Sequence, residues 1–222
     1  MILGIDDAGR GPVIGPMILA GVLLTKEQEK IMKKNDIRDS KTVTQSSRLV
    51  MEKLIKEHSV AYKIVQASPE LIDGSLTSGI NLNELEAKMV AKIINSINKE
   101  LKEKIKVIID CPSVNVVSWK DSLFKYLERK DNLEISCEHK ADANHLSAAA
   151  ASILAKVTRE EEVSKLKKEF GDFGSGYPSD PKTKNFLTEK GKEFSNSGIF
   201  RKTWATWKIA YPENSQGILA DF

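Results

Sequence analysis

Four aspartates stand at or shortly after the ends of apolar runs in the sequence. Asp6 and Asp7 close the first run, Asp110 closes a second, and Asp142 follows a third. If the first two runs are neighbouring parallel strands, Asp6 and Asp110 emerge at the same edge of a sheet. Carboxylates crowded there repel one another unless a cation neutralises them, and their hard oxygens suit Mg²⁺ or Mn²⁺. The pattern therefore indicates a site for one or two divalent cations.

Each of these aspartates also has an ordinary structural interpretation. An Asp that follows a strand commonly forms a turn or caps the first turn of a helix. Asp142, for example, precedes an expected helix that starts near Leu146. Spacing alone leaves both interpretations open, and only the convergence of several carboxylates favours the cation site.

A glycine-rich loop and a lysine supply a second kind of chemistry. Gly9, Arg10 and Gly11 follow the first two aspartates; such glycines let a backbone approach a ligand, and the arginine can reach a phosphate. A tight connection between strands needs the same glycines, so both interpretations stay open. Lys41 suits a phosphate contact or an ordinary surface loop. The chain contains no Gly-Lys-Ser/Thr sequence, so ATP binding by a P-loop is not supported.

Tyr177 lies in a stiff turn between Gly176 and Pro178. A ring held in such a turn is suited to stack on a sugar or a base. Taken alone, the pattern favours the ordinary role of a tyrosine that packs into a core, and stacking on a sugar or base is the alternative.

Composition narrows the class of protein. The 222 residues include 34 Lys and Arg against 31 Asp and Glu, a formal charge of +3 that permits a nucleic-acid partner without requiring one. No apolar stretch approaches the ~18 residues of a membrane-spanning helix, and no basic leader follows Met1. The two cysteines and three histidines lack metal-ligand spacing. We expect a reduced, cytoplasmic protein without a membrane partner, and a monomer.

The elements that must position these residues alternate between strand-like and helix-like patterns, which predicts an α/β protein with a sheet covered by helices. The first two strands are joined by a turn too short for a helix, so we expect them to pair antiparallel. Beyond residue 170, glycines and prolines indicate a change of structure. The expected strands are 2–5, 17–24, 60–67, 105–109 and 133–137, and the expected helices are 27–34, 45–58, 82–101, 116–129, 146–170 and 182–190.

Six segments, taken together and in this order, resemble ribonuclease HII, particularly its archaeal form. The segments are Gly4–Pro12, Asp39–Lys41, Ile109–Asp110, Lys140–Ala143, Ala151–Val157 and Gly174–Asp180. The resemblance implies a ribonuclease H-like fold, a mixed five-stranded sheet flanked by helices whose first three strands are antiparallel. It also implies a catalytic core over residues 1–170 and a helical substrate-binding region over 171–215.

The activity implied by the resemblance is endonucleolytic cleavage of the RNA strand of RNA/DNA hybrids, and cutting 5′ of a single ribonucleotide in duplex DNA. Products would carry 3′-hydroxyl and 5′-phosphate ends. The alternatives are another nuclease of the same fold, such as a junction resolvase, and a non-catalytic hybrid-binding module.

Residue by residue, the resemblance assigns the metal ions, Mg²⁺ or Mn²⁺, to Asp6, Asp7, Asp110 and Asp142. It assigns the ribose 2′-hydroxyl and the adjacent phosphate to the loop of Gly9, Arg10 and Gly11. Tyr177 would stack on the following deoxyribose, and Lys41 would contact a phosphate. A sensor for the 2′-hydroxyl is required because this group distinguishes RNA from DNA.

The family usually has Glu where this chain has Asp7, and the shorter side chain predicts weaker metal binding or a preference for Mn²⁺.

The tail 216–222 resembles a sliding-clamp-binding motif through Gln216, Leu219 and Phe222, although a frayed terminus explains the same residues.

Overall fold

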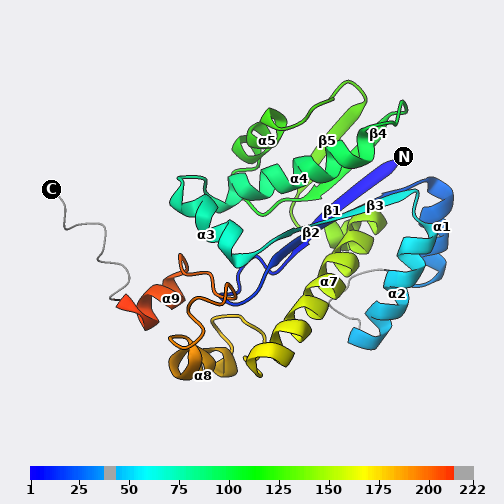
Figure 1. Cartoon of the computed structure of the whole chain (residues 1–222). Helices are drawn as coiled ribbons and strands as arrows, with labels where there is room; N and C mark the ends of the chain where they lie inside the picture. The colour runs from blue at the N-terminus through cyan, green and yellow to red at the C-terminus, as the bar shows by residue number, and fades with distance from the viewer. Residues whose placement is uncertain (38–43, 213–222) are drawn as a thin grey trace. The chain divides into compact units, whose positions relative to one another are not determined.

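A five-stranded sheet is built from the apolar runs of the sequence (Figure 1). In this computed structural model, which describes residues 1–37 and 44–212, the strand order is β3-β2-β1-β4-β5. β1 pairs antiparallel with β2 and parallel with β4, and β4 pairs parallel with β5. The predicted mixed sheet is confirmed. The strands are β1 (Ile2–Ala8), β2 (Met17–Leu24), β3 (Ala61–Ala67), β4 (Ile105–Asp110) and β5 (Leu133–Glu138).

Helices cover both faces of this sheet (Figure 1). On one face, α1, α2 and the first part of α7 bury side chains against alternate residues of β2, including Ile18, Ala20 and Val22. On the other face α4 lies against β2, where a Cβ added to Gly21 would stand 2.4 Å from Ile93. The helices are α1 (Lys26–Lys34), α2 (Gln45–His58), α3 (Pro69–Thr77), α4 (Leu82–Asn98), α5 (Val116–Lys125), α6 (Ala141–Asn144), α7 (Leu146–Phe170), α8 (Pro181–Lys190) and α9 (Ala205–Ala210).

The start of α7 lies directly on β1. A Cβ at Gly4 would come within 2.1 Å of the backbone at Ser147 and Ala148, so only glycine fits at this point of the strand. The alanine run from Ala148 to Ala151 is buried, and its small side chains allow the helix to come this close to the sheet. This contact brings the helix to the strand that carries the first two aspartates.

The chain divides into two compact units. The first contains the sheet and consists of Met1–Ala8, Ile18–Gln66 and Leu82–Arg159. The second combines Gly9–Met17 and Ala67–Asn81 with the chain from Glu160 onward. The division expected at residue 170 follows the order of the chain. That division into a catalytic and a substrate-binding region stays a prediction; in the second compact unit, two short early segments pack with the C-terminal part.

The second unit has an aromatic core. Val13 and Ile14 from the early segment share it with residues of α7, α8 and α9, and the rings of Phe200 and Trp207 lie 4.7 Å apart between centroids. The early segment also forms a bridge between Ile14 and Phe200. The buried and partly buried residues of this aromatic core are Val13, Ile14, Val163, Leu166, Phe170, Phe173, Phe186, Leu187, Phe194, Ile199, Phe200, Trp204, Trp207 and Tyr211.

Helix boundaries differ from the expected ones at a few places. α5 ends at Lys125 rather than Arg129, because Asn95 accepts a hydrogen bond from the Glu128 backbone and donates to the Tyr126 carbonyl, which fixes the turn after the helix. α3 was not expected from the sequence; Ser68 caps it and Pro69 stands in its first turn. Within the described residues no helix is long and apolar enough to cross a membrane.

Candidate active site

Asp6 is a buried carboxyl group near the end of β1. It is 6 % exposed, and burial, then the charge of Asp7 and to a smaller degree that of Asp110, raise its pKa to about 8. Hydrogen bonds from the Ser152 side chain and the Asp7 backbone oppose this rise. A carboxyl group in this environment is protonated near neutral pH unless a cation compensates its charge.

Asp7 is the next residue of β1 and donates its backbone N–H to Asp6 Oδ1 over 2.8 Å. In the register of the sheet Asp6 pairs with Ala20 and Asp7 with Leu19. Successive residues of a strand point to opposite faces, so the two carboxylates leave the strand in different directions. The length of the side chain at position 7 therefore decides how far its carboxylate can reach around the strand edge.

Asp110 ends β4 beside β1. Because Ile5 pairs with Ile109 in parallel register, Asp6 and Asp110 leave neighbouring strands at the same edge, as the sequence pattern predicted. The backbone N–H of Ala141 donates to Asp110 Oδ1 over 3.0 Å. This hydrogen bond ties the short helix α6, which carries Asp142, to the end of β4.

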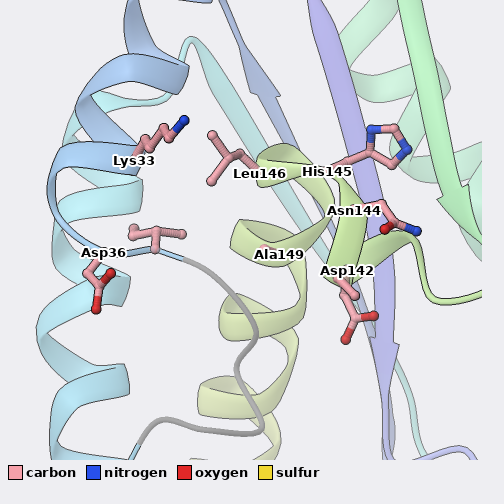
Figure 2. Close-up of a pocket in the computed structure, with 9 residues that line it drawn as sticks. Lys33, Asp36, Asp142, Asn144, His145, Leu146 and Ala149 are labelled. Atoms are coloured by element: carbon pink, nitrogen blue, oxygen red, sulfur yellow. The ribbon is translucent and has the colours of Figure 1, made fainter.

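Asp142 is 4 % exposed and lies one residue from that hydrogen bond. The turn into α6 is made by Lys140, whose left-handed backbone (φ 59°, ψ 41°) redirects the chain after β5. Asp142 borders a cavity of about 470 Å³. Figure 2 shows Lys33 and Asp36 on one side of this cavity and the α6–α7 segment with Asp142 on the other.

The four carboxyl groups do not form a closed cage. Among residues 1–37 and 44–212, no group of three or more His, Cys, Asp or Glu side chains is gathered closely enough to hold a metal ion. The charges of Asp7 and Asp110 raise the pKa of Asp6. Asp142 is linked to Asp110 only indirectly, because the backbone N–H of the neighbouring residue Ala141 donates a hydrogen bond to Asp110. The assignment of all four as metal ligands stays a prediction.

Ser152 was not expected as a site residue. It is fully buried in α7, and its side chain forms a hydrogen bond with Asp6. The clue in the sequence is a single hydroxyl within a run of alanines and aliphatic residues, from Ala148 to Ala155. A lone polar side chain on a buried helix face needs a partner, and here the partner is the carboxyl group of Asp6.

His145 adds a second polar pair next to the cavity. Its Nε2 lies 2.8 Å from Glu138 Oε2, and the Ser136 hydroxyl donates to Glu138 Oε1 over 2.7 Å. The hydrogen bond from Ser136, followed by that from His145, lowers the pKa of Glu138. This pair stabilises the segment between β5 and α7, on which Asp142 lies.

The predicted substrate loop of Gly9, Arg10 and Gly11 belongs to the second unit and follows β1 after Ala8. Gly9 has a φ of 82°, which explains glycine at this position. The loop carbonyls accept hydrogen bonds from two residues near the end of the chain. Arg201 donates to the carbonyls of Gly9 and Arg10, and Trp204 donates to that of Gly11.

Tyr177 lies beside this loop within the second unit. A Cβ on Gly11 would stand 3.5 Å from the Tyr177 ring, an ordinary contact, and the ring is 37 % exposed. The preceding residue, Gly176, has a φ of 80° and accepts the N–H groups of Val13 and Ile14 at its carbonyl. The structure thus brings together the loop and the tyrosine, two features that lie far apart in the sequence.

Four predicted residues lie outside the described part of the chain. These are Lys41, Gln216, Leu219 and Phe222.

Known proteins give the context for this arrangement. The family model described as Ribonuclease HII matches residues 3–207. The chain belongs to the ribonuclease HII family. A Ribonuclease HII of Methanocaldococcus jannaschii is 37 % identical over 225 aligned positions, which cover 97 % of each chain. Members of this family are nucleases, so the chain is an enzyme that hydrolyses nucleic acid.

Solved structures agree with this assignment. Ribonuclease H2 from Pyrococcus horikoshii superimposes with a TM-score of 0.84 at 33 % identity, covering 97 % of this chain and 99 % of the other. Ribonuclease HII of Archaeoglobus fulgidus, solved in a complex with PCNA, gives a TM-score of 0.79 at 35 % identity, with coverage of 92 % and 95 %. The ribonuclease H-like fold expected from the sequence is confirmed.

Proposed function

We propose that this ribonuclease HII hydrolyses the RNA strand of RNA/DNA hybrids and cuts 5′ of single ribonucleotides in duplex DNA. Products would carry 3′-hydroxyl and 5′-phosphate ends. The observation that carries the proposal is the burial of Asp6 between the charges of Asp7 and Asp110, with Ser152 bonded to its side chain. Such a group is costly to ionise without a cation, and we assign that cation a role in hydrolysis.

The donor set fits a divalent ion such as Mg²⁺ or Mn²⁺. Asp6, Asp7, Asp110 and Asp142 offer only carboxylate oxygens, which are the ligands that these hard cations prefer. When bound, two such ions supply an activated water and neutralise charge on the scissile phosphate. The side chains in the ion-free enzyme would have to converge further, because they form no closed cage among the described residues.

The residues of the chain then have distinct tasks. Asp6 holds a proton in the ion-free enzyme and gives it up when its oxygens become ligands. Ser152 fixes the orientation of the Asp6 carboxyl group, and the Ala141 N–H does the same for Asp110. These hydrogen bonds reduce the rearrangement that ion binding requires.

Recognition of the ribonucleotide is assigned to the loop and to Tyr177. The backbone N–H groups of Gly9, Arg10 and Gly11 suit the 2′-hydroxyl and the neighbouring phosphate, and the half-exposed Tyr177 ring beside Gly11 suits a deoxyribose face. Lys41 is proposed as a further phosphate contact. Cutting at a ribonucleotide requires both a sugar sensor and metal-binding carboxylates in one chain. In the sequence, only Ala8 separates the carboxylate of Asp7 from the loop that starts at Gly9.

The test uses end-labelled duplexes that carry none, one or four consecutive ribonucleotides, with the break mapped to the nucleotide. We expect no cut in all-DNA duplex, one cut 5′ of the single ribonucleotide, and cuts within the run of four. A junction resolvase would ignore the single ribonucleotide. Binding of the duplexes without any cut in Mg²⁺ or Mn²⁺ would identify a non-catalytic module instead, and either result would overturn the proposal.

A sliding clamp is the proposed protein partner. The relative from Archaeoglobus fulgidus was solved together with PCNA, and the tail of this chain carries Gln216, Leu219 and Phe222 at the spacing of a clamp-binding motif. An extended tail with apolar side chains can dock in a hydrophobic pocket of such a partner.

A further inference from the structure

Arg201 is a fully buried arginine with an unusual set of partners. It is 0 % exposed, and its guanidinium donates hydrogen bonds to backbone carbonyls of the glycine-rich segment. Nη2 lies 2.6 Å from the Gly9 carbonyl, Nη1 lies 2.7 Å from that of Arg10, and the Gly15 carbonyl accepts from both Nε and Nη2 at 3.0 and 2.9 Å. One side chain therefore holds both ends of the segment from Gly9 to Gly15.

Because the Arg201 guanidinium is buried, its hydrogen bonds hold the segment from Gly9 to Gly15 in one position. A guanidinium removed from water is costly unless its donors are satisfied, so moving the loop would leave a buried charge without its acceptors. Hydrogen bonds from a charged donor are also roughly twice as strong as neutral ones. The backbone strengthens the link, because the Arg201 N–H donates to the Val13 carbonyl and the Gly15 N–H donates to the Ile199 carbonyl.

Trp204 contacts both the loop and Arg201. Its indole Nε1 donates to the Gly11 carbonyl over 3.1 Å, and the Arg201 guanidinium lies 4.9 Å from the centre of its ring. The carbonyls of Gly9, Arg10 and Gly11 thus all accept hydrogen bonds from two side chains of one short C-terminal segment.

The direction of these carbonyls fixes the direction of the loop N–H groups. In a trans peptide the C=O of one residue and the N–H of the next point to opposite sides. None of the peptide bonds described in this chain is cis. Turning the Gly9 and Arg10 carbonyls toward Arg201 therefore turns the N–H groups of Arg10 and Gly11 away from it. A loop that reads a sugar through its N–H groups needs this orientation before the substrate arrives.

We propose that Arg201, supported by Trp204, is a positioning residue for ribonucleotide recognition. It holds the Gly9–Gly11 loop with its N–H groups directed toward the substrate sugar, and it sets how strongly the enzyme distinguishes ribose from deoxyribose. The inference rests on the proposed role of the loop, and it adds residues that the sequence patterns did not single out.

The experiment compares binding of a duplex with one ribonucleotide and of the matching all-DNA duplex, in an Asp142→Asn background that prevents cutting. The readout is the ratio of the two dissociation constants. We expect Arg201→Lys to reduce this ratio by about tenfold, because an ammonium cannot reach three carbonyls in a fixed fork. Trp204→Phe keeps an aromatic ring and loses one hydrogen bond, so a reduction of about threefold is expected.

Phe194→Leu is the matched control. Phe194 packs in the same aromatic core, against Phe170 and Phe186. All variants are first checked for a folded state at the assay temperature. We expect the control to lower stability and keep the wild-type ratio.

The outcomes are distinct. A folded Arg201→Lys protein, or a Trp204→Phe protein, that keeps the wild-type ratio overturns the inference and leaves the proposed function standing. A parent enzyme that binds both duplexes equally overturns the role of the loop itself. If Arg201→Lys does not fold, the Trp204→Phe ratio decides.

Discussion

At the scale of single residues, the chemistry depends on how Asp6 is surrounded. Burial, the neighbouring charges and the Ser152 hydrogen bond act on one carboxyl group, and the balance raises its pKa to about 8. The neighbouring aspartate contributes charge, but its side chain leaves the strand toward the other face. Both features lead to predictions that substitution can test.

The raised pKa of Asp6 predicts how stability depends on pH in the ion-free enzyme. In the unfolded chain this carboxyl loses its proton near pH 3.9, whereas in the folded state it keeps the proton up to about pH 8. The folded state therefore binds more protons between these values, so its stability falls as pH rises from about 4 to 8. The expected loss is a few kcal/mol, on the order of the shift times ~1.4 kcal/mol per pH unit, as an upper bound.

The measurement is urea unfolding between pH 5 and pH 8 in the presence of a chelator. Asp6→Asn removes the titrating group, so its stability should change much less over the same range. Parallel curves for the two proteins would show that Asp6 has an ordinary pKa.

Asp7→Glu restores the side-chain length that is usual in the family. The extra methylene lets the carboxylate reach further around the strand edge, and Mg²⁺ tolerates displaced ligands poorly. We expect the Mg²⁺ concentration for half-maximal cleavage to fall by about tenfold. The Mn²⁺ value should change less, because the strict octahedral requirement that makes ligand position critical is that of Mg²⁺. Unchanged curves for both ions would refute a role for side-chain length at this position.

At the scale of helices and strands, the close contact of α7 with β1 positions Asp6 against Ser152. The glycine at position 4 permits it, because any side chain would meet the helix backbone at Ser147 and Ala148. The contact explains why small residues recur on this part of α7.

Gly4→Ala is expected to destabilise the protein by about 3 kcal/mol, since a methyl group would overlap backbone atoms rather than a flexible side chain. It should also reduce cleavage, because shifting α7 moves Ser152 relative to Asp6. Gly74→Ala is the control: it lies within α3 with nothing within 4 Å of an added Cβ. There we expect stabilisation of about 0.5–1 kcal/mol. Equal effects of the two substitutions in chemical unfolding would contradict this account of α7.

Most elements that carry the site could be predicted from the sequence. Continuous apolar runs indicated β2 and β4, and the helix expected over 82–101 is present as α4, which buries Leu85, Met89 and Ile93. The end of α5 could not be predicted, because it depends on Asn95 from another helix. The same holds for Arg201, whose partners lie 186 to 192 positions away. Contacts over such distances leave no periodic pattern in a single sequence.

At the scale of the whole molecule, the sequence resemblance predicted the family, and the fold comparison agrees with it. The division into units was less accessible. Segments 9–17 and 67–81 join the second unit through contacts such as the Ile14–Phe200 bridge, and Asp73 accepting from the Lys202 and Thr203 backbone. These contacts join segments that lie far apart in the sequence, so no local pattern indicates them.

Deleting residues 216–222 tests the proposed clamp partner at this scale. We expect the truncated enzyme to lose capture by the sliding clamp in a pull-down, because the motif residues are removed together. Cleavage of a short duplex should be unchanged, since the carboxylates and the loop remain. A truncated enzyme that still captured the clamp would refute the docking role of the tail.

The most direct test of the central claim is a crystal structure of the enzyme soaked in Mn²⁺, with the ions located by anomalous scattering. We predict at least one ion bound jointly by Asp6 and Asp110, with Asp142 turned into the same site and Asp7 within reach of a second. Ions that bind elsewhere, or carboxylates that stay apart at saturating Mn²⁺, would contradict the account.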